Sequence, residues 1–135
     1  MSKSILIVDD DASIRSIIRT FVEADGYRVC GEAADGIEAI ERAKELQPEL
    51  ILLDLSMPRL NGAEAAGILR QEMPGARIVL FTMYADEFGE KLASAIGVQV
   101  VLSKPEGLSK LGEHLKALLN PDEPSTRSGF ASEAI

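Results

Sequence analysis

The feature that most constrains the fold is a repeated alternation between short aliphatic runs and segments with helical periodicity. The aliphatic runs are residues 5–8, 29–33, 50–53, 78–81 and 98–102. Runs of this kind are typical of strands that are buried on both faces of a sheet. Because helical segments separate them, the strands are expected to be parallel and joined by right-handed crossovers. The sequence therefore predicts an α/β fold of the form (βα)5, with helices on both faces of the sheet.

The segments between the runs have the apolar spacing of amphipathic helices. In the first segment the apolar residues fall at i, i+3, i+4, i+7 and i+8, namely Ile14, Ile17, Ile18, Phe21 and Val22. This spacing predicts a helix that buries these side chains against the sheet. Similar spacing predicts further helices within residues 88–96 and 108–118.

Capping and helix-breaking residues mark the expected helix ends. Asp11 precedes the first helical segment and is expected to cap it. Asp35 with Glu38 resembles a capping box, although Ser or Thr is the usual first residue. Gly26 and Pro48 follow the first and second helical segments, as expected of residues that end helices. These signals support the predicted alternation.

Composition narrows the class of protein. The formal net charge of −8 argues against direct nucleic-acid binding, because that affinity depends largely on clustered Lys and Arg. The apolar runs are too short to span a membrane, and the N-terminus lacks the apolar core of a signal peptide. Cys30 is the single cysteine, so no internal disulfide can form, and we expect a cytoplasmic protein.

The length of 135 residues fits one domain. We expect this domain to occupy residues 1–120. Residues 121–135 are rich in Pro, Ser, Thr and charge and have no periodicity. They are expected to form a flexible C-terminal tail or a linker stub.

Polar residues follow the predicted strands at one edge of the sheet. Asp9 and Asp10 follow the first strand, Asp54 the third, Thr82 the fourth and Lys104 the fifth. Ligands of open parallel sheets bind beyond the carboxyl ends of the strands. If the first strand lies beside the third, the three aspartates converge into an all-oxygen cluster of the kind that binds Mg²⁺. Thr82 and Lys104 could then bind phosphate oxygens, which predicts a phosphoryl-transfer site with a carboxylate nucleophile.

Four segments give the chain a close resemblance to response-regulator receiver domains of two-component signalling systems. They are "ILIVDDD", "LILLDLSMPRLNG", "IVLFT" and "SKP", in that order, and the resemblance extends over residues 4–119. It implies a flavodoxin-like fold, a doubly wound five-stranded parallel sheet with strand order 2-1-3-4-5. This order supplies the neighbour relation on which the convergence of the aspartates depends.

The resemblance also implies a role for each site residue. Asp54 would be the phosphoacceptor, and Asp9 and Asp10 would hold Mg²⁺ with Asp54 and the backbone carbonyl of Ser56. Lys104 would contact the phosphoryl group, and Thr82 would be the switch hydroxyl. A sensor histidine kinase or phosphotransfer protein would donate the phosphoryl group. A downstream protein partner would bind the switched surface, and the chain would be no enzyme beyond its own phosphorylation and dephosphorylation.

Two features leave the output open. Val101 stands where many receivers carry an aromatic residue whose rotation accompanies the switch. The stretches "FTMY" and "SKPEGLSKL" resemble receivers that precede a helix-turn-helix domain, but none follows within these 135 residues. A receiver that stands alone would bind a partner or drain phosphoryl groups from a relay.

The alternative hypothesis is a phosphohydrolase of the haloacid dehalogenase type with Asp9 as nucleophile. The "DDDAS" of residues 9–13 nearly fits the D-x-D-x-T motif of that family, but Ser13 departs from it. No acidic pair closes another strand after Lys104, and Asp54 would have no role. These three facts count against the hydrolase.

Overall fold

The computed structural model describes residues 3–54, 62–82 and 100–103, together with residues 113, 115, 116, 118 and 119. Its elements are, in order, β1 (Ser4–Val8), α1 (Ala12–Ala24), β2 (Arg28–Ala33), α2 (Gly36–Leu46), β3 (Leu50–Leu53), α3 (Gly62–Glu72), β4 (Arg77–Thr82) and β5 (Val100–Ser103). The helix predicted within residues 88–96 and the tail predicted over residues 121–135 lie outside the described residues. Among the described residues, every helix is too short or too polar to span a lipid bilayer.

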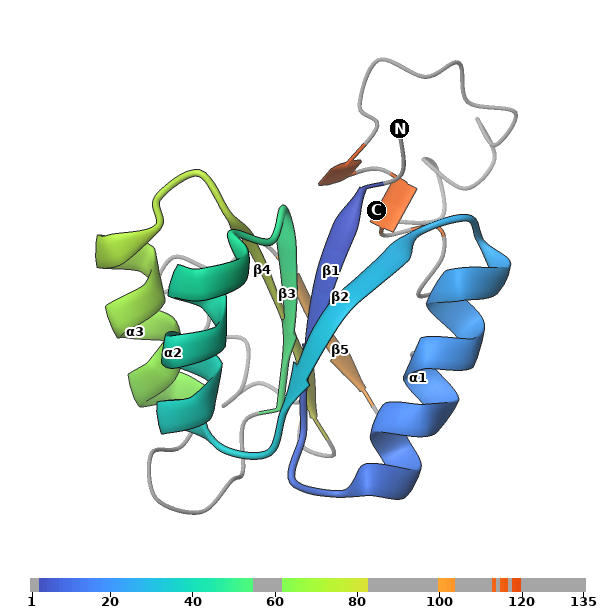
Figure 1. The fold of residues 1–135 in the computed structure, drawn as a ribbon, viewed down its shortest axis with the longest axis horizontal. Helices are drawn as coiled ribbons and strands as arrows, with labels where there is room; N and C mark the ends of the chain where they lie inside the picture. The colour runs from blue at the N-terminus through green and yellow to red at the C-terminus, as the bar shows by residue number, and fades with distance from the viewer. Residues whose placement is uncertain are drawn as a thin grey trace.

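The five strands form one parallel sheet in the order β2-β1-β3-β4-β5, as the resemblance implied. β1 therefore lies beside β3, with Val8 opposite Leu53. Leu53 in turn lies opposite Leu80 of β4. Figure 1 shows the strands side by side between the helices, with all of them pointing the same way. Their carboxyl ends therefore form one edge of the sheet, and their amino ends form the opposite edge.

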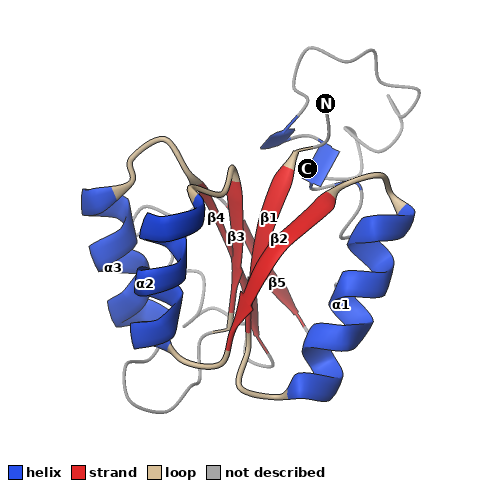
Figure 2. Ribbon diagram, in the orientation of Figure 1, coloured by secondary structure: helices blue, strands red, loops and turns tan. Residues whose placement is uncertain are grey.

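The sheet is buried on both faces, as the continuous aliphatic runs predict. Leu6 and Val8 of β1 pack on the face that α2 and α3 cover, while Ile5 and Ile7 pack on the α1 face. Figure 2 shows α1 on one side of the sheet and α2 with α3 on the other. Small side chains bring α2 and α3 close to the sheet, namely the buried Ala39, Ala43, Ala65 and Ala66.

The first helix forms as predicted, but its buried stripe is narrower than the sequence indicated. Ile18 and Val22 are buried, and Ile14 packs against the same cluster. Ile17 and Phe21 were expected on this face, yet they are 42% and 43% exposed. At 3.6 residues per turn, residues 14, 18 and 22 form one row and the other two side chains lie on its flank. The expectation that all five are buried is therefore wrong.

Both predicted caps are present. The Asp11 carboxylate accepts a hydrogen bond from the Ser13 N–H at 2.8 Å. This bond caps the first turn of α1, shortly after the end of β1 in the chain. Asp35 accepts from the Glu38 N–H at 2.9 Å, while the Glu38 carboxylate accepts from the Ala34 N–H at 2.6 Å. The capping box therefore forms, with its return bond one residue earlier than in the usual motif.

A β-bulge in β2 changes which way its side chains point. The pairing of β1 with β2 moves from Ile5 opposite Val29 to Leu6 opposite Gly31, which leaves Cys30 as the extra residue. A Cβ atom on Gly31 would lie 2.6 Å from the Leu46 side chain, so Gly31 faces α2, as does its neighbour Cys30. Two consecutive residues on one face invert the alternation beyond them. The next residue, Glu32, therefore faces α1.

Candidate functional site

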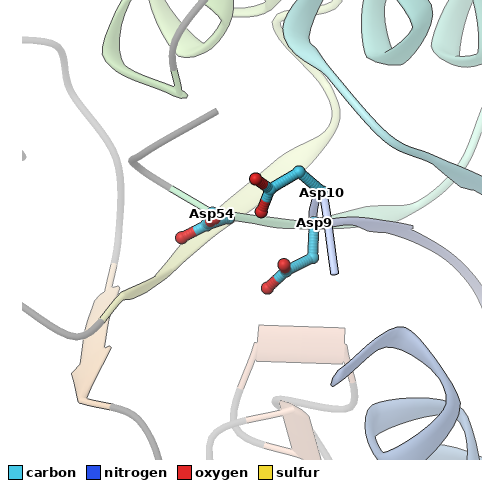
Figure 3. A group of neighbouring side chains, drawn as sticks. All are labelled: Asp9, Asp10 and Asp54. Carbon is cyan, nitrogen blue, oxygen red and sulfur yellow. The ribbon is translucent and has the colours of Figure 1, made fainter. Parts of the chain in front are cut away.

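The three predicted aspartates come together at the carboxyl edge of the sheet. Asp9 and Asp10 follow β1 directly, and Asp54 follows β3 directly. Because these strands are neighbours, one carboxylate oxygen from each residue lies within 4.8 Å of the other two. Figure 3 shows the three side chains gathered at the ends of these strands. We call Asp9, Asp10 and Asp54 the acidic cluster.

The sheet fixes the backbone at both strand ends of the acidic cluster. The Asp9 N–H donates to the Ala33 carbonyl at 3.1 Å, and the Asp54 N–H donates to the Val8 carbonyl at 2.9 Å. The hydrogen-bonding pattern of the sheet thus continues past the last strand residues. The carboxylates are held by rigid elements, which is what a binding site of defined geometry requires.

Burial differs between the members of the cluster. Asp9 is 2% exposed and Asp54 is 6% exposed, whereas Asp10 is exposed to solvent. Ionised carboxylates are rarely buried unless hydrogen bonds, cations or metals compensate for the lost solvation. Asp9 receives one such bond, because its Oδ1 accepts from the Asp11 N–H at 2.9 Å.

The donor chemistry of the acidic cluster fits Mg²⁺. This ion prefers oxygen ligands and is usually held by one or two carboxylates, water and phosphate. The acidic cluster offers one carboxylate oxygen from each of three residues, all within 4.8 Å of one another. The residues present therefore fit the all-oxygen ligand set that Mg²⁺ prefers.

A group of charged side chains that the sequence analysis did not single out lies next to this site. Arg15 donates from Nη1 to the Asp9 carbonyl at 2.6 Å and from Nε to Glu32 Oε1 at 2.8 Å. Arg19 pairs with Glu32 Oε2 at 2.7 Å and with Glu23 at 3.2 Å. We call Arg15, Arg19 and Glu32 the Glu32 network.

The pKa of Glu32 reflects this network. Burial alone raises the pKa of its carboxyl, but the hydrogen bonds and charges of Arg19 and Arg15 outweigh burial and hold it below its usual range. The sequence did contain one signal of this network. Arg15 and Arg19 are four residues apart on the helix that follows Asp9–Asp11, so both lie on the same helix face. Their partner was not predictable, because the bulge in β2 is what turns Glu32 toward α1.

Of the remaining predicted site residues, the structure describes the backbone of one, Thr82. Thr82 is the last residue of β4, and its backbone pairs with Ser103 of β5. The strand register puts Thr82 at the same edge as Asp54. Ser56 and Lys104 lie outside the described residues, so their contacts stay predictions.

Comparison with protein families identifies the chain. The model of the response regulator receiver domain matches residues 5–116. The chain belongs to this receiver family. The match includes every residue of the acidic cluster, as well as Thr82 and Lys104.

Individual relatives agree with this assignment. The chain is 35% identical over 123 residues to the alkaline phosphatase synthesis transcriptional regulatory protein PhoP of Bacillus subtilis, covering 91% of this chain and 51% of PhoP. It is 34% identical over 115 residues to the chemotaxis protein CheY of Thermotoga maritima, covering 85% of this chain and 96% of CheY. The receiver thus spans about half of one relative and nearly all of the other.

Solved structures give the same fold. The response regulator domain of Thermotoga maritima CheB superposes with a TM-score of 0.83 at 28% identity, covering 91% of this chain and 100% of that domain. The flavodoxin-like fold inferred from the sequence is therefore confirmed.

The haloacid dehalogenase hypothesis is not supported. The receiver match extends over both Asp9 and Asp54. In the structure Asp54 is a member of the same cluster as Asp9, although that hypothesis gave Asp54 no role.

Proposed function

We propose that this receiver accepts a phosphoryl group on Asp54 from a sensor histidine kinase or a phosphotransfer protein. Phosphorylation then switches a surface that a downstream protein partner binds. The observation that carries this proposal is the convergence of Asp54 with Asp9 and Asp10 at the carboxyl edge of the sheet. Membership of the receiver family supports the same role.

The position of Asp54 within the cluster supports its assignment as the phosphoacceptor. β3 is the central strand of the sheet, so Asp54 lies between the end of β1 and the end of β4. A phosphoryl group on Asp54 would have the other two carboxylates on the β1 side and Thr82 on the β4 side. Asp9 and Asp10 then serve as metal ligands, together with Asp54 and the carbonyl of Ser56.

The chemistry is a transfer between two phosphorylated side chains. A carboxylate oxygen of Asp54 attacks phosphorus and forms the new O–P bond. The P–N bond of the donor phosphohistidine breaks, and its electron pair remains on the imidazole nitrogen. Mg²⁺, when bound, neutralises charge on the phosphoryl oxygens. Lys104 contacts these oxygens as well, and the Thr82 hydroxyl turns toward them, which couples the acyl phosphate to the surface.

The proposed boundaries and partners follow from the same assignment. Residues 1–120 form the receiver, and residues 121–135 form a tail or linker stub. Beyond its own phosphorylation and dephosphorylation, the chain is proposed to catalyse no reaction. Its net charge of −8 makes direct nucleic-acid binding by these 135 residues unfavourable. The proposed partner of the switched surface is a protein, and the proposed location is the cytoplasm.

A labelling experiment tests this function. The protein is incubated with Mg²⁺ and phosphoramidate, and its intact mass is measured before and after brief treatment with acid or hydroxylamine. Wild type is expected to gain one labile phosphoryl group, and Asp54→Asn is expected to gain none. Labelling of Asp54→Asn at Asp9 would contradict the proposal and favour a hydrolase.

A further inference from the structure

Arg15 links the acidic cluster to the neighbouring strand. Its guanidinium holds the Asp9 carbonyl with Nη1 at 2.6 Å and Glu32 of β2 with Nε at 2.8 Å. The Arg15 side chain is 17% exposed and that of Glu32 is 29% exposed, so this contact is shielded more than an ordinary surface ion pair. One side chain thus ties α1, β2 and the end of β1 together.

Further hydrogen bonds hold Asp9 from β2 and from the start of α1. The Asp9 carboxylate accepts the Asp11 N–H, and Asp11 in turn caps the helix that carries Arg15. The Asp9 N–H is held by the Ala33 carbonyl of β2. The backbone of Asp9 is therefore held on both sides, and its carboxylate is held by the Asp11 N–H.

We infer that Arg15 is a positioning residue, which orients the Asp9 carboxylate for the divalent cation by fixing the backbone of Asp9. This inference rests on the proposed function, because it assumes that the acidic cluster binds Mg²⁺. Residues that orient metal ligands without touching the metal typically change metal affinity about 10- to 100-fold when replaced. The planar guanidinium serves both Glu32 and the carbonyl at fixed angles, which a lysine ammonium cannot reproduce.

Charge and geometry make opposite predictions for Arg15. If the residue acted only through its positive charge, its removal would make the site more negative and would strengthen Mg²⁺ binding. If it acts by positioning Asp9, removal weakens Mg²⁺ binding, although the site becomes more negative. The sign of the change in affinity therefore separates the two roles.

Arg19 provides a matched control. It is one helical turn from Arg15 and pairs with the same Glu32 carboxylate. The hydrogen bonds and ion pairs of Arg19 run to Glu32 and Glu23, and within the described part of the chain none of these reaches residues 9–11. Loss of Arg19 therefore removes an ion pair between α1 and β2 without releasing the Asp9 carbonyl.

The test compares Arg15→Ala, Arg15→Lys and Arg19→Ala with wild type. Three quantities are measured: the thermal midpoint without metal, the Kd for Mg²⁺ by calorimetry at fixed ionic strength, and the amide NMR shift of Asp11. Both alanine variants are expected to lower the metal-free midpoint. Arg15→Ala is expected to raise the Kd about tenfold and to move the Asp11 amide resonance, whereas Arg19→Ala leaves both near wild type.

Arg15→Lys keeps the charge and a well-folded helix, so it decides the case if the alanine variant is too unstable to measure. We expect Arg15→Lys to raise the Kd by a smaller factor than alanine does. Tighter Mg²⁺ binding by Arg15→Ala, an equal change in Arg19→Ala, or wild-type affinity in Arg15→Lys would overturn the inference. A wild type that binds no Mg²⁺ would overturn the proposed function and this inference together.

Discussion

The two edges of the sheet treat carboxylates in opposite ways. At the amino edge, Glu49 accepts the Ser4 N–H at 3.2 Å with one oxygen and pairs with Lys3 at 3.4 Å through the other. At the carboxyl edge, the acidic cluster brings three carboxylates within 4.8 Å of one another. Pairing unlike groups favours stability, whereas gathering like charges sets up a place for a cation. In this receiver the site proposed for phosphorylation thus lies at the edge where like charges gather, and not at the edge where unlike charges pair.

The largest expected effect comes from neutralising one carboxylate at each end of β3. Glu49 precedes this strand and Asp54 follows it, so Asp54→Asn and Glu49→Gln form a matched pair of isosteric changes. Asp54→Asn is expected to abolish phosphorylation, because it removes the nucleophile, while Glu49→Gln leaves the rate of labelling unchanged. Intact-mass measurement after incubation with phosphoramidate and Mg²⁺ checks both. Equal labelling of the two variants would remove the functional distinction between the edges.

The next effect is stabilisation by Mg²⁺. Because the unfolded chain cannot assemble the acidic cluster, Mg²⁺ binds the folded state and stabilises it by about 2.7 kcal/mol at a hundredfold excess over Kd. Thermal or denaturant unfolding of wild type in EDTA and in millimolar Mg²⁺, at fixed ionic strength, measures this increment. Glu49→Gln should retain the whole increment. An increment of zero in wild type would show that the three aspartates do not form a metal site.

The gathering of aspartates at one edge of the sheet was largely predictable from the sequence, because it depends only on the approximate positions and the direction of the strands. The aliphatic runs gave strand positions to within two residues, as the predicted run 98–102 and the observed Val100–Ser103 illustrate. Parallel strands put Asp9, Asp10 and Asp54 at one edge whatever their exact ends. The strand order that makes them neighbours came from the family resemblance and not from the runs.

The finer features depend on side-chain packing and register, which the sequence pattern does not contain. Ile17 and Phe21 fit the helical stripe, yet the width of the contact with the sheet leaves both partly exposed. The Glu32 network depends on the bulge at Cys30, since without that extra residue Glu32 would face α2. A one-residue irregularity thus decides whether Arg15 has a partner.

Removing one charge from the acidic cluster should make the metal-free protein more stable. Asp10→Asn relieves repulsion between like charges, so we expect the free energy of unfolding in EDTA to rise by an amount on the order of 1 kcal/mol. The same change should abolish most of the Mg²⁺ increment, because a ligand is lost. Denaturant melts of this variant with and without Mg²⁺ give both values. A variant that is less stable than wild type in EDTA would indicate that Asp10 contributes hydrogen bonds and not repulsion.

At the amino edge a similar deletion should have the opposite sign. Glu49→Ala removes the acceptor of the buried Ser4 N–H and the partner of Lys3. A hydrogen bond of this kind contributes about 1 kcal/mol, so the free energy of unfolding should fall by about that amount. Because Glu49 is at the other edge, the Mg²⁺ increment should not change. If Glu49→Ala also weakened Mg²⁺ binding, the two edges would be coupled and not independent.

The smallest expected effect tests whether position or pairing decides the behaviour of a carboxylate. Glu32 lies near the carboxyl end of β2, yet it is paired with Arg15 and Arg19, as Glu49 is paired at the opposite edge. Its pKa is held below the ordinary value of 4.5. The unfolded chain therefore binds a proton at Glu32 more readily than the folded chain. The stability that Glu32 contributes is present above pH 4.5 and is lost as the pH falls through its folded pKa.

Glu32→Gln cannot titrate at this position, so the difference in unfolding free energy between wild type and the variant should be constant near neutral pH and shrink below pH 4.5. Denaturant unfolding of both proteins from pH 7 to about pH 2.5, without metal, measures this difference. A difference that stayed constant down to about pH 2.5 would indicate that the ion pairs of Glu32 contribute nothing to stability. Glu32 lies near the carboxyl edge but has charged partners, as Glu49 has at the amino edge. A difference that shrinks in acid would therefore show that the partners of a carboxylate decide its effect on stability. The strand end from which the carboxylate projects would not decide it.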